Sequence, residues 1–309
     1  MKQLLFLFLI LGPISCYAWQ SNQDKPILSQ EFSGQTIETL DFQTKGLSVQ
    51  LNSWEEDRIY VEVLALRDNK PVSWDDPQLE KKLEAYQFNV QEVGNRLIIQ
   101  VDYEKKSRLK SGKDNILLLF KVMSPPSKNS FFNTDGGSIT LAGMDGKQQL
   151  KSHGGSIRAI DCKGEMSAES SGGSIFVDKF KGEVDLNSGG GSLRVDSFSG
   201  SIKANSSGGN MSLTDISGKA IALSEGGSIK ASFVKPLEEI SMTSKGAGID
   251  LILPKELPMT VNFSGSIVVS KHLNFEGETK KTLVKGTING GGIPVSAITS
   301  GANVRVDYN

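Results

Sequence analysis

Residues 170–223 read SSGGSIFVDKFKGEVDLN (170–187), SGGGSLRVDSFSGSIKAN (188–205) and SSGGNMSLTDISGKAIAL (206–223), which are three copies of one 18-residue unit. The period holds without insertion or deletion from Gly136 to Ser228. Each copy has a glycine pair and, about half a copy later, a single glycine. The pairs are Gly136-Gly137, Gly154-Gly155, Gly172-Gly173, Gly190-Gly191, Gly208-Gly209 and Gly226-Gly227, and the single glycines are Gly146, Gly164, Gly182, Gly200 and Gly218. This pattern predicts a solenoid, in which one supersecondary unit stacks on copies of itself.

Apolar residues recur at fixed places in the unit. Two columns spaced two residues apart predict a short strand with one buried face, and a bulky column precedes the middle glycine. Two more inward columns predict a second strand after that glycine. The columns are Ile139, Ile157, Ile175, Leu193, Met211 and Ile229; Leu141, Ala159, Val177, Val195, Leu213 and Ala231; Met144, Cys162, Phe180, Phe198, Ile216 and Val234; Met166, Val184 and Ile202; and Leu150, Ala168, Leu186 and Ala204. Strands of successive coils should pair in parallel about 4.8 Å apart. We therefore predict an all-β fold, a single-stranded parallel β-helix of 18-residue coils.

A column of serines follows the second strand. Its members are Ser152, Ser170, Ser188, Ser206 and Ser224, with Thr134 at its start. The column lies two residues beyond an inward column, so its hydroxyls should face inward and bond neighbouring backbone groups. A catalytic serine needs one activated copy beside a base, whereas this serine recurs in every coil without a matching histidine. The column is predicted to be structural.

The first residues have the parts of a secretory signal peptide. Lys2 precedes an apolar run over 4–11, and Ala18 offers a small residue for cleavage before residue 19. We expect a signal peptide over 1–18 and an exported protein in the periplasm, on the outer-membrane surface or secreted. A lipid anchor at Cys16 is the alternative, but Pro13 stands where a lipobox has leucine, which favours cleavage after Ala18. No later stretch reaches the roughly 20 consecutive apolar residues of a membrane-spanning helix.

Charge and cysteine content narrow the classes further. The formal net charge is −1, which argues against nucleic acid as the main partner. After signal removal Cys162 is the one remaining cysteine, so no intramolecular disulfide can form. Because Cys162 stands in a column of Met, Phe, Ile and Val, we expect it to be a small core residue rather than a reactive thiol.

Less regular segments flank the repeat. Residues 19–34 are polar and predict a flexible lead, and 35–124 predict a β-rich cap over the first coil, with one helix. That helix should start at Asp75 or Asp76, place Pro77 in its first turn and continue through Leu79 and Leu83 to Tyr86. The β-helix itself is expected over 131–309, regular to about residue 234 and degenerate afterwards.

Several motifs resemble a known family. The repeated Ser-x-Gly-Gly-Ser-Ile unit, the segments 49–54 and 59–63, and the closing segments 289–294 and 299–306 are similar to those of the bacterial putative adhesin family of β-strand-repeat proteins. The resemblance covers most of the chain after the signal. It implies a β-helix in the cell envelope, and no family catalytic or ligand residues carry over to this sequence.

Enzymatic and metal-binding alternatives rest on few residues. Polysaccharide lyases and hydrolases also have parallel β-helix folds, with clustered carboxylates on one outer face. The corresponding residues here would be outward aspartates near one turn. These aspartates could also form a loose calcium site. The aspartates are Asp161, Asp178, Asp196 and Asp215, and they alternate between two adjacent positions, which favours a solvated turn. His153 and His272 are too far apart in sequence to indicate a metal site. No catalytic, cofactor-binding or metal-binding residue is assigned, and no cofactor is expected.

One outward column offers a candidate binding patch. It contains Thr140, Arg158, Phe176, Arg194, Ser212 and Lys230, of which Arg158, Phe176 and Arg194 could bind an anion or a glycan. We predict a non-enzymatic cell-envelope solenoid acting as an adhesin-like binding or scaffold surface. Its partner would be an envelope protein or a cell-surface polymer. The alternative is a carbohydrate-active enzyme, a lyase or a hydrolase, on the same fold.

Overall fold

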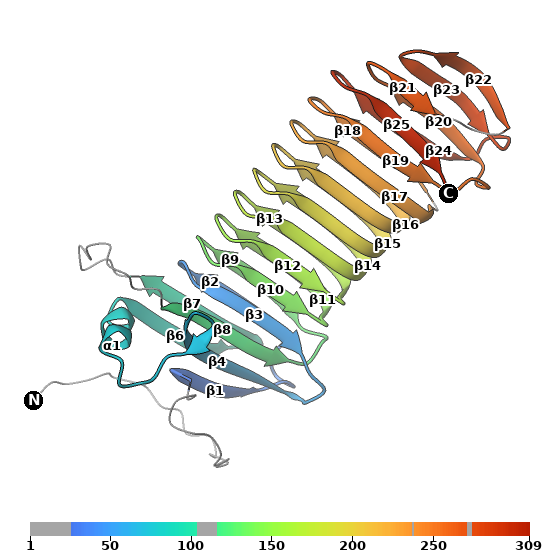
Figure 1. The fold of residues 1–309 in the computed structure, drawn as a ribbon. Helices are drawn as coiled ribbons and strands as arrows, with labels where there is room; N and C mark the ends of the chain where they lie inside the picture. Colours follow the sequence, from blue (N-terminus) through green and yellow to red (C-terminus); the bar gives the residue numbers. More distant parts are fainter. Residues whose placement is uncertain (1–25, 104–115, 237, 271–273) are drawn as a thin grey trace, which may run out of the picture.

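The computed structural model describes residues 26–103, 116–236, 238–270 and 274–309. Within these ranges the chain forms 25 strands and one short helix, and the strands of successive coils lie side by side along an elongated stack (Figure 1). The predicted signal peptide, the cleavage site after Ala18 and the alternative anchor at Cys16 lie outside the described residues. The fold is the predicted all-β parallel β-helix. No helix in the described part of the chain is long and apolar enough to cross a membrane.

The central coils keep the register that the sequence predicts. They comprise β9 (Asn129–Thr134), β10 (Ile139–Ala142), β11 (Asp145–Ser152), β12 (Ile157–Ile160), β13 (Lys163–Ser170), β14 (Ile175–Ser188), β15 (Leu193–Ser206), β16 (Met211–Ser224) and β17 (Ile229–Lys235). We call the first ladder the parallel strands in line with β10 and β12, and the second ladder those in line with β11 and β13. Strands β14, β15 and β16 contribute to both ladders, and β14 pairs with β15 from Ile175↔Leu193 to Ser188↔Ser206.

The bend between the two ladders differs from the predicted glycine turn. Strands β14, β15 and β16 run through it without a break, and the chain bends where one residue per coil adopts a left-handed conformation. These residues are Asp161, Lys179, Ser197 and Asp215, with φ values of 53°, 52°, 55° and 56°. The glycine three residues later also has positive φ, 137° at Gly182. A left-handed residue thus points the chain into the second ladder while the next side chain stays inside.

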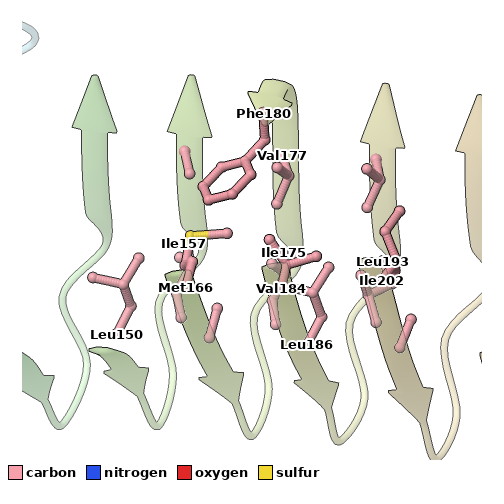
Figure 2. Packing of buried hydrophobic residues seen from close by; sticks show 14 of the residues in the cluster. Leu150, Ile157, Met166, Ile175, Val177, Phe180, Val184, Leu186, Leu193 and Ile202 are labelled. Atoms are coloured by element: carbon pink, nitrogen blue, oxygen red, sulfur yellow. The ribbon is translucent and has the colours of Figure 1, made fainter. Parts of the chain in front are cut away.

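The core lies between the two ladders. Figure 2 shows side chains from both, including Ile175, Val184 and Leu186, pointing into the same interior, and all three are at most 4% exposed. The serine column is buried as predicted. The Ser188 hydroxyl donates to the carbonyl of Gly191 at 2.7 Å, and the Ser152 hydroxyl donates to the carbonyl of Gly137 in the preceding coil at 3.0 Å. Each hydroxyl satisfies a backbone group of a tight turn.

One predicted core position is wrong. Val234 is 59% exposed, and Phe233 fills the place that the repeat assigned to it. Strand β17 pairs Ile216 with Phe233, one residue short of the 18-residue period, and the register shifts on both sides of that pair. Strand β17 contains no left-handed residue at the bend. The inward position after the bend is therefore taken by Phe233, one residue earlier than the 18-residue period predicts. The period therefore breaks inside this coil rather than after it.

The N-terminal segment contributes solenoid coils of its own to the stack. Its elements are β1 (Leu28–Ser33), β2 (Thr39–Thr44), β3 (Ser48–Ser53), β4 (Arg58–Arg67), β5 (Lys70–Pro71), α1 (Pro77–Leu83), β6 (Tyr86–Val93), β7 (Arg96–Tyr103) and β8 (Leu117–Ser124). Strand β2 lies in parallel between β9 and β7, and β3 lies in parallel between β10 and β8. Both ladders therefore continue through the predicted boundary at 124–131. Strands β7 and β8 form the outermost coil at the N-terminal end of the stack. Strand β6 pairs antiparallel with β7 and β4 pairs antiparallel with β8, so they cover the edge of this coil, as a cap requires.

Two predictions for this segment need correction. The predicted flexible lead is wrong from residue 28 onward, because β1 pairs antiparallel with β4 along its whole length. The helix has the predicted N-terminus, with the Asp76 carboxylate accepting the Gln78 amide at 2.8 Å and Pro77 at the first position. It ends at Leu83 rather than continuing to Tyr86, because Tyr86 already belongs to β6 and pairs with Tyr103.

The C-terminal coils are less regular than the central ones and are not stacked in chain order. They comprise β18 (Ile240–Ser244), β19 (Ile249–Leu253), β20 (Met259–Ser264), β21 (Val268–Ser270), β22 (Phe275–Lys280), β23 (Leu283–Ile288), β24 (Ile293–Thr299) and β25 (Val304–Tyr308). The final strands β24 and β25 lie between the coil of β18 and β19 and the coil of β20 and β21. The antiparallel pair β23 and β22 then closes the second ladder.

Candidate functional site

The predicted surface patch forms a stack on the first ladder. Arg158 in β12 is the register partner of Phe176 in β14, which is the partner of Arg194 in β15. The guanidinium carbon Cζ of Arg158 lies 4.4 Å from the Phe176 ring centroid, and that of Arg194 lies 5.7 Å from it. Both are within cation–π range. The structure thus brings together all three residues of the predicted patch.

The two arginines of this stack are held differently. The Arg194 Nε donates to an Asp196 carboxylate oxygen at 2.7 Å, and the Arg194 side chain is 63% exposed. Arg158 is also exposed, and among the described residues no carboxylate oxygen lies within 4.0 Å of its nitrogens. Asp178 and Asp196 are register partners in the next outward column, on the side of the bend. Arg158 therefore keeps its hydrogen-bond donors available to solvent or to a ligand.

A second serine column, which the sequence reasoning did not single out, borders the stack. It contains Ser138, Ser156, Ser174, Ser192 and Ser228, with Asn210 in one coil. The Ser138 hydroxyl oxygen accepts the Ser156 amide at 3.3 Å, and that of Ser174 accepts the Ser192 amide at 3.2 Å. The repeat does contain the pattern that predicts this column, because these serines directly precede an inward residue and must therefore face outward.

The second ladder carries shallow, open grooves lined by both polar and apolar side chains. One groove is bounded by Lys147, Gln149, Ser167, Asp185 and Lys203, among others. Ion pairs cross between adjacent coils on this face. Their nitrogen–oxygen distances are 3.3 Å for Lys147–Glu165, 3.1 Å for Lys151–Glu169 and 3.5 Å for Lys203–Asp185. Each of these three carboxylates is thus paired with a lysine of an adjacent coil.

The outward aspartates occupy the two adjacent columns that the sequence predicted. Asp161 and Asp215 are the left-handed residues of their bends, whereas Asp178 and Asp196 lie one position earlier. Within the described residues no three His, Cys, Asp or Glu side chains gather to hold a metal ion. The His153 Nδ1 lies 3.5 Å from an Asp135 carboxylate oxygen on the glycine-pair turn, and His272 is outside the described residues.

Cys162 is 1% exposed inside the core, which confirms its predicted packing role. Burial in apolar surroundings raises the pKa of its thiol, Asp161 raises it further, and backbone hydrogen bonds oppose the shift only in part. A raised pKa keeps the sulfur protonated and unreactive at neutral pH. The residue therefore contributes packing and no chemistry.

Solved structures of bacterial proteins resemble this chain weakly. A structure described as a putative adhesin from Bacteroides fragilis is 11% identical, with a TM-score of 0.38, over 91% of this chain and 96% of that chain. One from Parabacteroides distasonis, described in the same words, is 12% identical with a TM-score of 0.31 over 91% and 96%. A putative cell adhesion protein from Clostridium sporogenes is 9% identical with a TM-score of 0.25 over 92% and 100%. At these scores the likenesses carry no argument about function.

The family comparison is more informative. No curated protein matches the chain. The family model described as Toastrack DUF4097 matches residues 37–307, from the start of the N-terminal coils to the last strand. The match spans both ladders and confirms the family resemblance seen in the repeat motifs. The chain belongs to the Toastrack DUF4097 family.

Proposed function

We propose that this protein is a non-catalytic component of the cell envelope whose β-solenoid presents an extended surface to a partner. The observation that carries the proposal is the Arg158–Phe176–Arg194 stack. It combines an aromatic ring and two cations on the outside of a rigid parallel ladder. Repeat architectures bind through such extended faces rather than through enclosed pockets. An exported adhesin-like or scaffold role follows from this surface together with the signal-like N-terminus.

The competing proposal is a carbohydrate-active enzyme on the same fold. It would use the neighbouring carboxylates of Asp178 and Asp196, which are register partners on the first ladder. The ion pair between Asp196 and Arg194 favours a structural role for that carboxylate. Lyase or hydrolase activity on envelope polysaccharides that disappears in Asp178→Asn or Asp196→Asn would establish the enzyme and overturn our proposal.

The direct test is crosslinking of the tagged full-length protein in its native cells, followed by fractionation and mass spectrometry. We expect a reproducible envelope adduct, either a protein or an insoluble polymer, that the double variant Phe176→Ala/Arg194→Ala loses. The matched control is Ser167→Ala on the second ladder, which should retain the adduct. An adduct that persists unchanged in the double variant would remove the stack from the binding surface. No adduct in any fraction would contradict the binding role.

A further inference from the structure

Arginines from two coils already contact the Phe176 ring. Arg158 belongs to the preceding coil and Arg194 to the following coil, and both guanidinium groups lie over the ring, at 4.4 and 5.7 Å from its centroid. A sugar ring would have to displace a guanidinium group to stack on Phe176, whereas an anion can bind the guanidinium groups where they lie. The sequence left an anion and a glycan as alternatives for this patch, and these contacts favour a negatively charged group.

Hydrogen-bond donors accompany the ring on the same outward side of the ladder. Arg158 offers guanidinium N–H groups that no described carboxylate engages, and its contact with Phe176 orients them. Arg194 keeps its terminal N–H groups because Asp196 occupies only its Nε. Ser174 stands two residues before Phe176 on the same outward side, and its oxygen accepts the Ser192 amide, so its hydroxyl proton can donate to a ligand. An oxyanion beside Phe176 could therefore accept from donors of three coils.

The same outward column continues along the solenoid axis. Ser212 follows Arg194 and Lys230 follows Ser212 in register, so Arg158, Arg194 and Lys230 stand on alternate coils. Two strand spacings separate such residues, about 10 Å. This spacing suits a linear polymer whose oxyanions can lie about 10 Å apart.

We propose that the Arg158–Phe176–Arg194 stack binds a carboxylate or sulfate group of a linear acidic polysaccharide, with Lys230 contacting a second oxyanion of the same chain. This proposal rests on the proposed binding function and names the ligand class of that surface. Asp178 and Asp196 lie on the bend side of the stack and oppose the anion, whereas the serine column lies on the other side. The polymer therefore runs along the serine side.

The aspartates supply a variant that should gain affinity. Asp196→Asn removes a carboxylate that competes for Arg194, so it should bind the polymer more tightly than the natural protein. Arg158→Ala removes the unpaired guanidinium, and Arg158→Lys keeps the charge but loses the planar donor set. Lys147→Ala on the second ladder removes one exposed cation elsewhere and serves as the charge-matched control.

The experiment measures the dissociation constant of the purified protein for a sulfated oligosaccharide and for a polyuronate fragment at low ionic strength. We expect about a tenfold loss for Arg158→Ala, consistent with losing a hydrogen bond to a charged group, a smaller loss for Arg158→Lys, a gain for Asp196→Asn and no change for Lys147→Ala. Circular dichroism checks that each variant is folded.

Equal losses in Arg158→Ala and Lys147→Ala, or no binding to either probe, would overturn the proposal. Binding to anionic phospholipid vesicles but not to the oligosaccharides would overturn it in favour of a membrane surface. If these probes fail while the crosslinked adduct in cells still depends on Phe176 and Arg194, the binding function stands and only the ligand class is wrong.

Discussion

At the residue scale, the two glycines of each pair differ in how closely they approach the preceding coil. A Cβ added at Gly173 would lie 2.1 Å from the carbonyl oxygen of Gly155 in the preceding coil, whereas a Cβ at Gly172 would lie 3.5 Å from the His153 carbonyl oxygen. The second glycine of the pair therefore lets adjacent coils approach to strand spacing. The first one is required by no contact of this kind.

This difference makes a matched pair of substitutions informative. We expect Gly173→Ala to lower the free energy of unfolding by about 1–3 kcal/mol or more, because the clash is with backbone rather than with a flexible side chain. Gly172→Ala should change it by less than about 1 kcal/mol. Urea denaturation followed by circular dichroism measures both values. Similar losses in the two variants would show that the coils are not packed as closely as described.

Cys162 gives a second residue-scale prediction. Because burial raises the pKa of its thiol in the folded state, the thiol stays protonated in the fold at pH values where the unfolded chain begins to ionise. The stabilising contribution is thus full below the unfolded pKa and is lost as pH rises through the folded pKa. We expect iodoacetamide at pH 8 to label Cys162 in urea but scarcely in buffer, as measured by peptide mass spectrometry. Rapid labelling of the folded protein would contradict the burial.

At the element scale, the central coils were predictable from the sequence because their register depends on local sequence features. Each column position is set by alternation along one strand and by glycine at the turns, so Ile175 and Leu193 had to align. The slip at Phe233 was missed because an apolar pair, Phe233 and Val234, fits either register, and the missing left-handed residue leaves no signature in residue type.

The order of the terminal coils could not be predicted in the same way. Neighbouring positions in sequence favour neighbouring positions in space, yet β3 lies between β8 and β10, and β24 lies between β18 and β20. Parallel pairing between any two apolar coils looks alike in sequence, so only the assembled stack decides the order. The pairing of Arg158, Phe176 and Arg194 was predictable from the period, but the guanidinium–ring contacts and the bond between Ser174 and the Ser192 amide were not.

The inserted C-terminal coil leads to a truncation experiment. Removing residues 293–309 deletes β24 and β25, which separate the coil of β18 and β19 from that of β20 and β21. We expect the chain beyond about residue 240 to become sensitive to protease while the central coils stay protected, because repeat stability is a sum of neighbour contacts. Limited proteolysis with mass spectrometry reads this out. Deleting β1, which among the described strands pairs with β4 alone, should leave the central and C-terminal coils protected. Loss of protection over the entire truncated chain would contradict a stack of neighbour-only contacts.

At the scale of the whole molecule, charge contributes little to stability. The net charge is −1, and the ion pairs between coils lie on the solvent-facing side: Lys147 and Glu165 are both more than half exposed, and Lys203 and Asp185 are 60% and 44% exposed. Exposed pairs of this kind typically contribute at most about 1 kcal/mol and are screened by salt. We expect 1 M sodium chloride to leave the melting temperature nearly unchanged, as measured by calorimetry. A large drop in salt would show that these pairs stabilise the stack.

The proposed binding surface is the outward side of the first ladder. Its most direct test places a photocrosslinking amino acid at Ser212, in the column of Arg158 and Lys230, and separately at Ser167, on the second ladder. Both positions carry outward serines, so the substitutions are matched. In living cells we expect an envelope adduct from position 212 and none from position 167. Adducts from position 167 alone, or equal adducts from both, would contradict it.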